Sequence, residues 1–401
     1  MHVKQSPIHY SNWILFFVGY ICFLSPLQSQ NEIQNLKDKF KEVGFENIRI
    51  MNQNDTLVFC FEDRTYQWKV NGLLKAMELS TSIYPDAKGI QFFLLDRDIP
   101  KLSIGLQKKN SKWISKVSNS IDNSWHKLKK EKPQNKSQWK FDFIPYTQFA
   151  LRNTSFHKIY RVQLNFAPAV EVSPWKGMRF VGQYIFPIYN DLGYWGKWVR
   201  PGIIMVQQEF KPFDRWYVNL SWGNYSNYRY GAVMGIRHYF LNNAFAANLQ
   251  LAYTGKSYYH NNKWFIKEIN QLSYRASLEY FLPYYGLHIE LGYEKYIADD
   301  QGLRFDLSRF FKNTCVGFYA TLIEKEISGG FHFAIPILPK KRSKPRRLRV
   351  RLPYYFDWEY YSRTNTNRGQ YFEIQPDENR IENYYDSKYI ETQLKINRDE
   401  K

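Results

Sequence analysis

The chain has 401 residues, which is more than one average domain, so we expect two or three structural units. Aromatic residues make up 18% of it, yet the mean hydropathy is -0.55, and after residue 30 no apolar run approaches the ~20 residues of a membrane helix. This excludes a helical membrane protein and leaves two classes, transmembrane β-strands or a soluble aromatic-rich β-sandwich.

The first 29 residues have the features of a secretory signal peptide. A basic start precedes an apolar core from Trp13 to Leu24, and we expect cleavage after Ser29. The core is about a dozen residues long, too short to cross a bilayer as a helix. Lipidation at Cys22 is a weaker alternative, because Tyr20 and Ile21 are bulky where a lipoprotein signal has small residues.

Residues 30–106 carry the pattern of a small α/β domain. Ile33, Leu36 and Phe40 recur at helical spacing, and two short apolar runs around a polar turn predict a hairpin. A second helical pattern and the strand Ile90–Leu95 follow. This order predicts a sheet that is covered on one face, and secretion would place the domain in the periplasm.

Residues 107–144 are rich in basic residues, and we interpret them as a linker. The stretch from Lys101 to Lys140 contains eleven lysines against Asp122 and Glu131. Apolar residues such as Trp113 and Trp125 keep a rough helical spacing, which predicts a basic amphipathic segment. It would lie on a membrane surface or simply tether two domains.

From residue 145 to residue 361 the apolar positions recur with the period of two that is typical of β-strands. Leu164, Leu278, Leu291 and Phe333 belong to the apolar phase of strong runs. The longer runs approach the ~10 residues with which a tilted strand crosses a bilayer, and weaker runs bring the total to about twelve strands. The sequence therefore predicts a mainly β protein, an antiparallel transmembrane β-barrel behind a small α/β domain.

The other phase of the same runs carries charge, which predicts a polar lumen, whereas a β-sandwich would have an aliphatic inner face. Eight charged side chains are expected to face the lumen: Arg161, Glu171, Arg275, Glu279, Glu290, Glu294, Arg304 and Asp306. Aromatic pairs near the strand ends predict girdles at the membrane interfaces. These pairs are Tyr258–Tyr259, Tyr284–Tyr285, Tyr354–Tyr355 and Tyr360–Tyr361.

The net charge of +19 usually points to nucleic acid, but a secreted chain leaves the cytoplasm. Anionic lipid phosphate or an acidic polysaccharide is the better partner, and ordinary solvated charge is an equally weighted alternative. The clearest cluster should form one exposed loop at a barrel rim: Lys340, Lys341, Arg342, Lys344, Arg346 and Arg347. Residues 362–401 are polar and are interpreted as a C-terminal tail.

No motif predicts catalysis, a metal or a cofactor. The nearest approach is His288 with Glu290 and Glu294 on one strand face, which lumen charge pairing explains more simply. Ser328 with its following glycines lies inside a strand run, so we interpret the glycines as room for neighbouring side chains rather than as part of a hydrolase motif. Cys60 and Cys315 are expected to be buried in different domains without a disulfide.

Three segments, in this order, resemble the YjbH-like family of exopolysaccharide-secretion outer-membrane proteins. They are Leu36–Arg49 (LKDKFKEVGFENIR), Leu303–Gly317 (LRFDLSRFFKNTCVG) and Glu326–Pro336 (EISGGFHFAIP). The resemblance covers the chain from about Asn31 to Tyr360. It implies periplasmic α/β structure joined to an outer-membrane barrel, with a role in polysaccharide or capsule production, and it supplies no catalytic residue.

The chain departs from that family in being short and in lacking a convincing lipoprotein signal. We therefore expect an outer-membrane barrel of a Gram-negative bacterium that serves exopolysaccharide or capsule secretion, as a conduit or as a docking partner of the export machinery. The alternative is a structural or adhesion protein of the outer membrane without a transport role. An enzyme inside the barrel is a distant third hypothesis. The sequence does not identify the polysaccharide or the partner chain.

Overall fold

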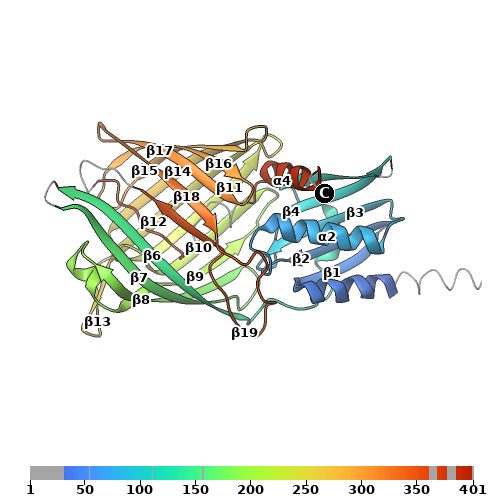
Figure 1. Cartoon of the computed structure of the whole chain (residues 1–401), viewed down its shortest axis with the longest axis horizontal. Coiled ribbons are helices and arrows are strands. Elements are labelled where there is room, and N and C mark those ends of the chain that lie inside the picture. Colours follow the sequence, from blue (N-terminus) through green and yellow to red (C-terminus); the bar gives the residue numbers. More distant parts are fainter. Residues whose placement is uncertain are drawn as a thin grey trace, which may run out of the picture.

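The computed structural model describes residues 31–53, 55–110, 112–155, 158–360, 368–376 and 385–399. The expected signal peptide, its cleavage after Ser29 and the alternative lipidation at Cys22 lie outside these residues. The described chain forms two sheets, a small one near the N-terminus and a large one made from the rest (Figure 1).

The small domain begins with the predicted elements in the predicted order. A helix occupies residues 31–43, and β1 (Glu46–Gln53), β2 (Thr56–Glu62), α2 (Lys69–Ile83) and β3 (Gly89–Asp96) follow. The strands lie in the order β1-β2-β3-β4-β5. Only β2 and β3 are parallel, because α2 crosses over between them, whereas the neighbours joined by short turns are antiparallel.

The sheet is extended by residues that the sequence analysis assigns to a linker. β4 (Ile99–Lys109) and β5 (Lys112–Ser118) form an antiparallel hairpin, and α3 (Asn123–Leu128) packs Trp125 and Leu128 against the second face of the sheet. The linker interpretation of residues 107–144 is therefore wrong for this part. The lysines alternate with Trp113 and Val117 along one strand, so the charge is that of a solvated strand face rather than of a tether.

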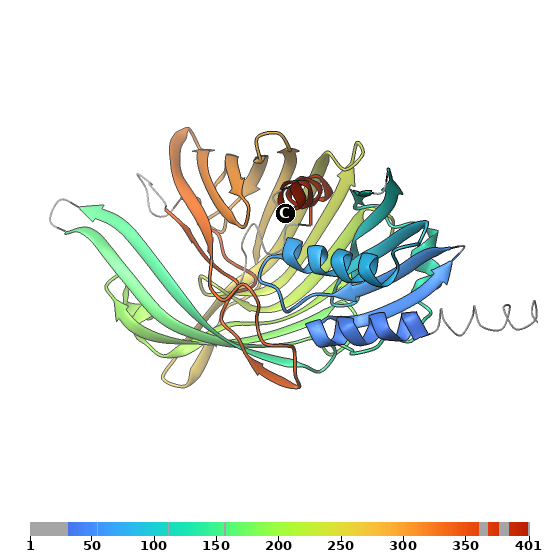
Figure 2. The same ribbon diagram turned by 45° about the vertical axis from the view of Figure 1, so that its right-hand side comes forward.

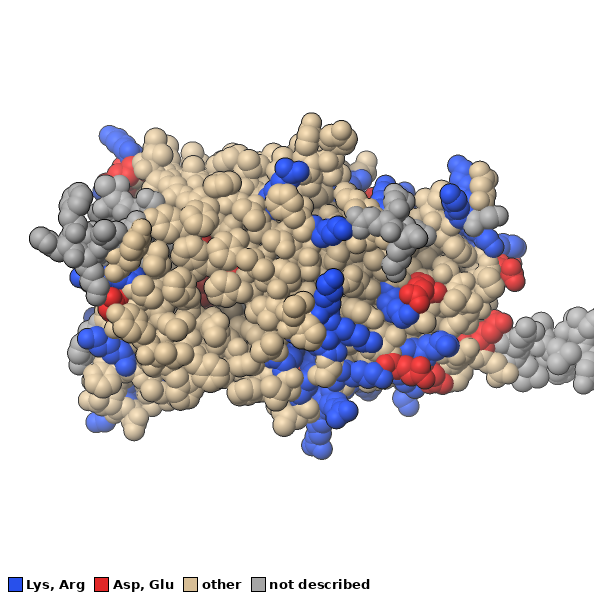
Figure 3. All heavy atoms as spheres, viewed as in Figure 1, with Lys and Arg blue, Asp and Glu red and all other residues tan. Residues whose placement is uncertain are grey.

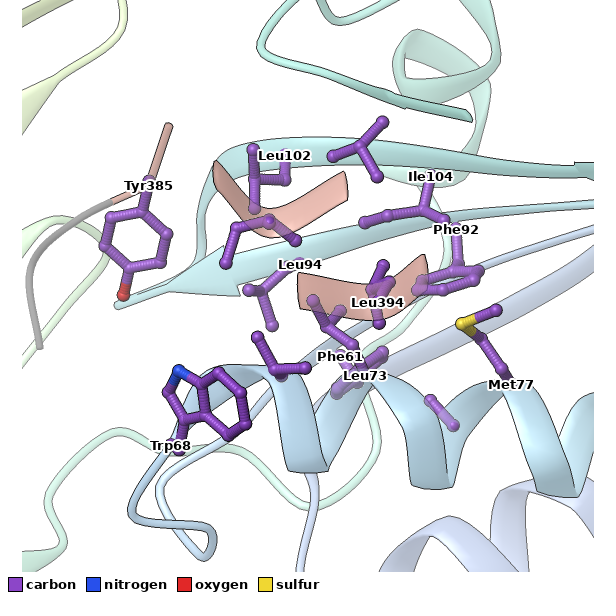
Figure 4. Packing of buried hydrophobic residues seen from close by; sticks show 14 of the residues in the cluster. Phe61, Trp68, Leu73, Met77, Phe92, Leu94, Leu102, Ile104, Tyr385 and Leu394 are labelled. Carbon is purple, nitrogen blue, oxygen red and sulfur yellow. The ribbon is translucent and has the colours of Figure 1, made fainter. Parts of the chain in front are cut away.

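The C-terminal residues also belong to the small domain, which corrects the expectation of a polar tail. α4 (Ser387–Asp399) inserts Tyr389, Ile390 and Leu394 into the main core of the domain. Figure 4 shows Leu394 among Phe92, Leu102 and Ile104, beside the α2 residues Leu73 and Met77. The helical period places the apolar side chains of α4 on a single face. Polar residues lie between them in the sequence, so the average composition of residues 362–401 is polar and does not reveal this face.

The large sheet contains twelve strands of nine or more residues in the described part of the chain. These are β6 (Phe141–Ser155), β7 (Lys158–Val172), β8 (Met178–Asn190), β9 (Arg200–Phe210), β10 (Trp216–Tyr225), β11 (Arg229–Phe240), β12 (Phe245–His260), β14 (Gln271–Leu282), β15 (Leu287–Lys295), β16 (Gln301–Phe311), β17 (Thr314–Ile323) and β18 (Glu326–Pro336). Each pairs antiparallel with the next in this order. The sheet curls round on itself, and the small domain lies at one end of the curl (Figures 1 and 2).

The two edges of the curl are connected by one segment, which contains β19 (Leu348–Val350) and β20 (Tyr355–Glu359). β19 pairs parallel with β6, and β20 pairs antiparallel with β18. No ladder joins β6 directly to β18 among the described residues. Phe149 of β6 and Trp358 of β20 bring their rings within 5.9 Å. The chain is therefore mainly β with a large antiparallel sheet, and residues 348–359 lie along the seam between its edges.

Two ends of the curled sheet are distinguished below. The domain-side rim carries the turns that face the small domain, such as residues 173–177, where the Gly177 N–H donates to the Arg97 carbonyl at 2.8 Å. The far rim carries the opposite turns, including residues 226–228 and 296–300, the short helix η1 (Tyr194–Lys197) and β13 (Lys263–Ile266), which pairs with β12. Cys60 and Cys315 are both buried, on β2 and β17 respectively.

Candidate functional site

The outer face of the curled sheet is apolar and exposed. Leu278 and Leu291 are 44% and 52% exposed, and Phe318 is 65% exposed, although each lies in the middle of a strand. The side chains that alternate with them point inward and are mostly buried. In β17, for example, buried and exposed residues alternate from Cys315 to Ile323. In the space-filling view, charge is scarce over this face and gathers at its ends (Figure 3). The apolar positions of the alternating runs therefore lie on the outer face of the sheet, and the positions between them lie on the inner face.

Six of the eight predicted interior charges form one compact group on β14, β15 and β16. Arg275 contacts Glu290 at 2.6 Å and Glu294 at 3.2 Å. Neighbouring register positions bring Glu279, Glu290 and Asp306 into one row across the three strands. Three carboxylates in a row would repel one another, so this half of the interior needs cations on both sides of the row.

Arginines from nearby strands supply those cations. Arg237 donates to both carboxylate oxygens of Glu279, with Nη2 to Oε2 at 2.6 Å, and His288 lies 3.3 Å from the same carboxylate. Arg304 makes a two-point contact with Glu359 of β20, at 3.0 Å for each pair of atoms. The interior charges are therefore largely satisfied by one another, and Arg237 and Glu359 are members that the sequence analysis missed.

Glu171 and Arg161 lie apart from this group, on β7. Glu171 is near the domain-side rim and accepts from Arg179 Nη2 at 3.1 Å, with Arg351 at 3.7 Å. Arg161 shares its strand phase but is exposed, because it lies toward the end of the β6–β7 hairpin that projects away from the small domain (Figure 1). That Arg161 faces a lumen therefore stays a prediction.

A serine, a histidine and an aspartate meet on the inner face of β16 and β18. Ser308 Oγ donates to Asp306 Oδ1 at 2.8 Å, and His332 Nε2 lies 3.1 Å from the same oxygen and 3.4 Å from Ser308 Oγ. A hydrolytic triad needs the acid on one imidazole nitrogen and the nucleophile on the other. Here one nitrogen faces both groups, so the cluster has the geometry of an interior hydrogen-bond network. In the described residues, no cluster of His, Cys, Asp and Glu has the make-up of a metal site.

The glycines after Ser328 leave room for an aromatic neighbour, as the sequence analysis interprets them. A β-carbon on Gly330 would lie 2.0 Å from the Tyr360 carbonyl oxygen and 2.7 Å from the Tyr319 hydroxyl. That hydroxyl donates to the same carbonyl at 2.9 Å. Any larger residue at this position would therefore displace the contact between β17 and the seam segment.

The other half of the interior is apolar and is occupied by residues 368–376. Phe372 and Ile374, each 7% exposed, belong to a buried cluster with inward side chains from β6 to β12, among them Ile144, Ile203 and Tyr225. The rings of Phe372 and Tyr225 are stacked, with centroids 5.4 Å apart. The predicted polar lumen is thus wrong for this half of the curl, where the chain covers an apolar wall with its own C-terminal segment.

The same segment passes from the far rim toward the domain-side rim. Near the far rim the Gly369 N–H donates to Asp300, and the Ser226 N–H donates to the Glu373 carbonyl at 3.1 Å. Gln375 accepts from Arg179, the second residue of β8 at the domain-side rim. Two residue steps, at most about 7 Å of backbone, separate the far-rim contact of Glu373 from Gln375. α4 begins in the small domain.

The basic loop lies at the domain-side rim and against the small domain. The Arg342 N–H donates to the Thr65 carbonyl at 2.7 Å, and the Gln67 N–H donates to the Lys340 carbonyl at 3.0 Å. Lys340, Lys341, Lys344, Arg346 and Arg347 are exposed, as expected. Figure 3 shows Lys and Arg gathering where the curled sheet meets the small domain.

Arg342 differs from the rest of the loop, which corrects its assignment as an exposed loop residue. Its side chain is buried, and Nη2 donates to the Ile337 and Pro353 carbonyls at 2.7 Å each. Arg349 and Arg351, just after the loop, are also buried and hold Asp142 of β6 at 2.6 and 3.0 Å. These three arginines fasten the loop to the sheet, and the five exposed cations remain available to a partner.

Aromatic side chains ring both ends of the outer face. Trp175, Phe213 and Tyr284 are 54%, 72% and 89% exposed at the domain-side rim. Tyr189 and Phe265 are 54% and 53% exposed toward the far rim. Tyr354 and Tyr355, predicted for a girdle, are instead 4% exposed each, because they pack in the core between the sheet and the small domain. Tyr361 lies outside the described residues.

Two buried carboxylates outside the curled sheet have altered acidity. Burial raises the pKa of Glu62 in β2 to about 7, although Asn47 Nδ2 and Ser137 Oγ hydrogen-bond to it at 2.7 and 3.1 Å. Burial also raises the pKa of Asp386 to about 6, and its Oδ1 accepts from the Tyr389 N–H at 2.8 Å at the start of α4. Both groups are held by hydrogen bonds, Glu62 within the small domain and Asp386 at the start of α4.

Comparisons with known proteins give few relatives. No family model matches the chain, and no curated protein matches it. Among solved structures, it is similar to OmpT of Vibrio cholerae, an outer membrane protein, and to its loop L8 deletion mutant, with 8% identity in each case. The matches cover 48% of this chain and 79% and 85% of those chains, at TM-scores of 0.24 and 0.26. At such scores the likeness supports no statement about activity. No helix in the described ranges is long and apolar enough to cross a membrane.

Proposed function

We propose that this chain is an outer-membrane β-barrel protein, with its small domain in the periplasm, that serves exopolysaccharide or capsule secretion as a docking partner of the export machinery. The single observation that carries the membrane assignment is the outer face of the curled sheet. Leucine, phenylalanine and tryptophan side chains are exposed there on strand after strand, while the charges are turned inward.

The size of this apolar face argues against water as its surroundings. Monomeric soluble proteins rarely expose a contiguous apolar patch larger than about 300–600 Å². The twelve strands have 9 to 16 residues each, which matches the ~10 residues of a tilted strand in a bilayer. Aromatic residues at both rims fit the two membrane interfaces, as in the aromatic belts of membrane proteins.

The polysaccharide role rests on two further features. One is the order of the three segments that resemble the YjbH-like family, namely Leu36–Arg49, Leu303–Gly317 and Glu326–Pro336. The other is the basic loop, whose five exposed cations lie where the curled sheet meets the small domain. Such a cluster attracts an acidic polymer or a phosphate, with screening over ~8 Å at physiological salt.

Docking is favoured over free conduction in this state because the interior is occupied. Residues 368–376 fill the apolar half, and ion pairs fill much of the other half. The same observation supports the second candidate, a structural or adhesion protein of the outer membrane without a transport role. The two candidates differ in whether the basic loop affects the polymer.

The test replaces the five exposed cations Lys340, Lys341, Lys344, Arg346 and Arg347 with Gln and leaves Arg342 intact. A matched control replaces five exposed lysines of the small domain, namely Lys109, Lys112, Lys116, Lys127 and Lys130. Surface polysaccharide is measured together with the amount of protein in the outer membrane and its heat-modifiable migration. We expect less polymer for the loop variant alone, at unchanged protein abundance.

Other outcomes are also decisive. Equal polymer in the loop variant, the control and the parent would leave the structural candidate as the better one. Recovery of the parent protein in the soluble periplasm would overturn the membrane assignment itself.

A further inference from the structure

The strand β19 carries an apolar stripe, Leu348 and Val350, where the curled sheet meets the small domain (Figure 1). These two side chains are 68% and 67% exposed, whereas Arg349 between them is buried and pairs with Asp142 on the inner side. Val350 lies opposite Phe143, near the start of β6, so the stripe continues the apolar outer face up to the domain-side rim. In the proposed membrane, side chains on this face contact acyl chains.

Two exposed arginines precede the stripe, on the side away from the middle of the sheet. Arg346 and Arg347 come directly before Leu348, and β19 runs parallel to β6, from the domain-side rim toward the far rim. The Phe141 N–H donates to the Arg347 carbonyl at 2.9 Å, which fixes the backbone at the rim. Within the described residues, neither arginine forms an ion pair with an acid. Their charged ends therefore lie at the edge of the apolar face, where a bilayer has its phosphates.

Buried neighbours hold the backbone around the two arginines. Pro345 is buried, and the buried Arg342 donates through Nη2 to the Ile337 and Pro353 carbonyls at 2.7 Å each. A fixed backbone loses less conformational entropy when its exposed side chains bind a ligand. The two arginines are thus presented by an ordered part of the chain.

Two lysines of the same loop lie toward the small domain instead. Lys341 forms a single β-bridge with Tyr66, and its Nζ lies 5.6 Å from the ring centroid of that tyrosine. The Lys340 carbonyl accepts from the Gln67 N–H at 3.0 Å. Both lysines are exposed, so they provide a matched pair of cations away from the apolar stripe.

We propose that Arg346 and Arg347, together with Leu348 and Val350, bind an anionic phospholipid of the periplasmic leaflet. The guanidinium groups bind the phosphate, to which each can donate two N–H bonds, and the apolar stripe contacts the acyl chains. Phosphatidylglycerol has a net negative charge, whereas phosphatidylcholine has none, so the site prefers the first. The site rests on the proposed membrane-spanning sheet and periplasmic domain, but it does not depend on the polysaccharide role.

The experiment measures which lipids stay bound to the purified full chain. The protein is released intact from detergent micelles in a mass spectrometer, after addition of phosphatidylglycerol or phosphatidylcholine, and its lipid adducts are quantified. The test variant carries Arg346→Gln and Arg347→Gln, and the matched control carries Lys340→Gln and Lys341→Gln. The test variant alone should bind phosphatidylglycerol about 30-fold more weakly than the parent, the effect expected for two cations at an anionic surface. Binding of phosphatidylcholine should be equal in all three proteins.

A second variant and a competitor define the lipid. Leu348→Ser and Val350→Ser keep both arginines and should weaken both lipids to a similar degree, because the acyl chains are alike. Inorganic phosphate should not displace phosphatidylglycerol, since it has no acyl chains to contact the stripe. Displacement at equal concentration would assign the arginines to free phosphate and overturn the lipid site.

The results separate the site from the proposals on which it rests. Loss of the phosphatidylglycerol preference in the arginine variant alone supports the site. No preference in the parent, or equal losses in the arginine and lysine variants, would overturn the site and leave the membrane-spanning sheet untouched. If the parent stays in the soluble periplasm and shows no heat-modifiable migration, the membrane proposal fails, and the lipid site fails with it.

Discussion

The interior of the curled sheet has two unlike halves. On β14, β15 and β16 it is lined by carboxylates and arginines that pair with one another and with Glu359. On β6 to β12 it is lined by aliphatic side chains and small residues that pack on Phe372 and Ile374. The charged side chains of the first half pair with one another. The apolar side chains of the second half are instead covered by a segment from elsewhere in the chain.

The difference follows from the cost of exposing each kind of wall. An ion pair with good geometry tolerates water beside it, so the charged half can border an open space. An apolar wall exposed to water loses about 25 cal/mol for each Å² that is uncovered. The chain offsets this cost with nine residues of its C-terminal region, and the half of the curled sheet that receives them becomes a packed core.

The largest predicted effect concerns the charged half. Asp306 is fully buried and accepts hydrogen bonds from Ser308, with Arg304 and His332 beside it. Replacing it with Asn removes one of the two acids that contact Arg304, the other being Glu359, together with the carboxylate acceptor of Ser308, and we expect a loss of about 3–5 kcal/mol in the free energy of unfolding, the range for breaking a buried ion pair. Urea unfolding of the full chain in lipid vesicles measures this.

The matched control for Asp306→Asn is Glu326→Gln at the rim. Glu326 pairs with Arg368 at 3.0 Å, but its side chain is 44% exposed, so the expected loss is below about 1 kcal/mol. The large expected difference follows from burial, because the structure places most of the interior charges in buried pairs. Equal effects for the two variants would mean that the charged half is open to bulk water.

The second prediction compares the inner and outer faces. Leu291→Arg puts a charge on the outer face, where the side chain is 52% exposed, and we expect a cost of about 2–4 kcal/mol near the midplane of a bilayer. Leu241→Arg, in the turn between β11 and β12, is the control and should cost little, because that residue lies at the rim and is 66% exposed. Refolding yield and urea unfolding in vesicles measure both. In detergent-free water the exposed Leu291 would tolerate arginine, so a small cost in vesicles would argue against a lipid-facing sheet.

Much of the sheet could be predicted because its alternation is strong where the two faces differ. Runs such as Leu287–Lys295 alternate because one face is apolar and the other is charged. The weaker runs are residues 178–189, 202–210, 229–240, 244–253, 315–322 and 348–360, and for the first of them, in β8, the structure gives a reason. Val181 and Ile185 point inward onto the C-terminal segment, while Tyr184 and Phe186 point outward, so both phases are apolar. In β8, weak alternation thus indicates that the inner face of the strand is apolar as well and is covered by another part of the chain.

The elements that sequence analysis missed are those that local patterns do not encode. α4 and residues 368–376 are polar on average, and their role depends on partners more than 100 positions away, such as Trp68, whose Nε1 donates to the Tyr389 hydroxyl at 3.1 Å. The buried Arg342 is likewise indistinguishable in sequence from its exposed neighbours Lys341 and Lys344. Periodicity reports which residues share a face, but it does not report what covers that face.

The smallest predicted effect concerns a buried acid that lacks a close cation, in contrast to Asp306. The donors to Glu62 are neutral, namely Asn47 Nδ2, Ser137 Oγ and the Asp98 N–H, and burial raises its pKa to about 7 from the usual 4.5. Below pH 4.5 the folded and unfolded states are both protonated at this site. As the pH rises toward 7 the unfolded state ionises first, so the free energy of unfolding falls, by at most about 3 kcal/mol, and levels off above pH 7.

Glu62→Gln removes this titration, so it should flatten the decline between pH 4.5 and 7 and leave the protein more stable than the parent at pH 8. At pH 4 the two proteins should be alike, because a protonated Glu and a Gln make similar hydrogen bonds. Glu78→Gln on the exposed side of α2 is the control, with its side chain 57% exposed, and should keep the pH profile of the parent. Hydrogen exchange of the β2 amides in the full chain measures the local free energy. If the parent profile is already flat, Arg64, whose charge opposes the effect of burial, holds Glu62 ionised in the folded state.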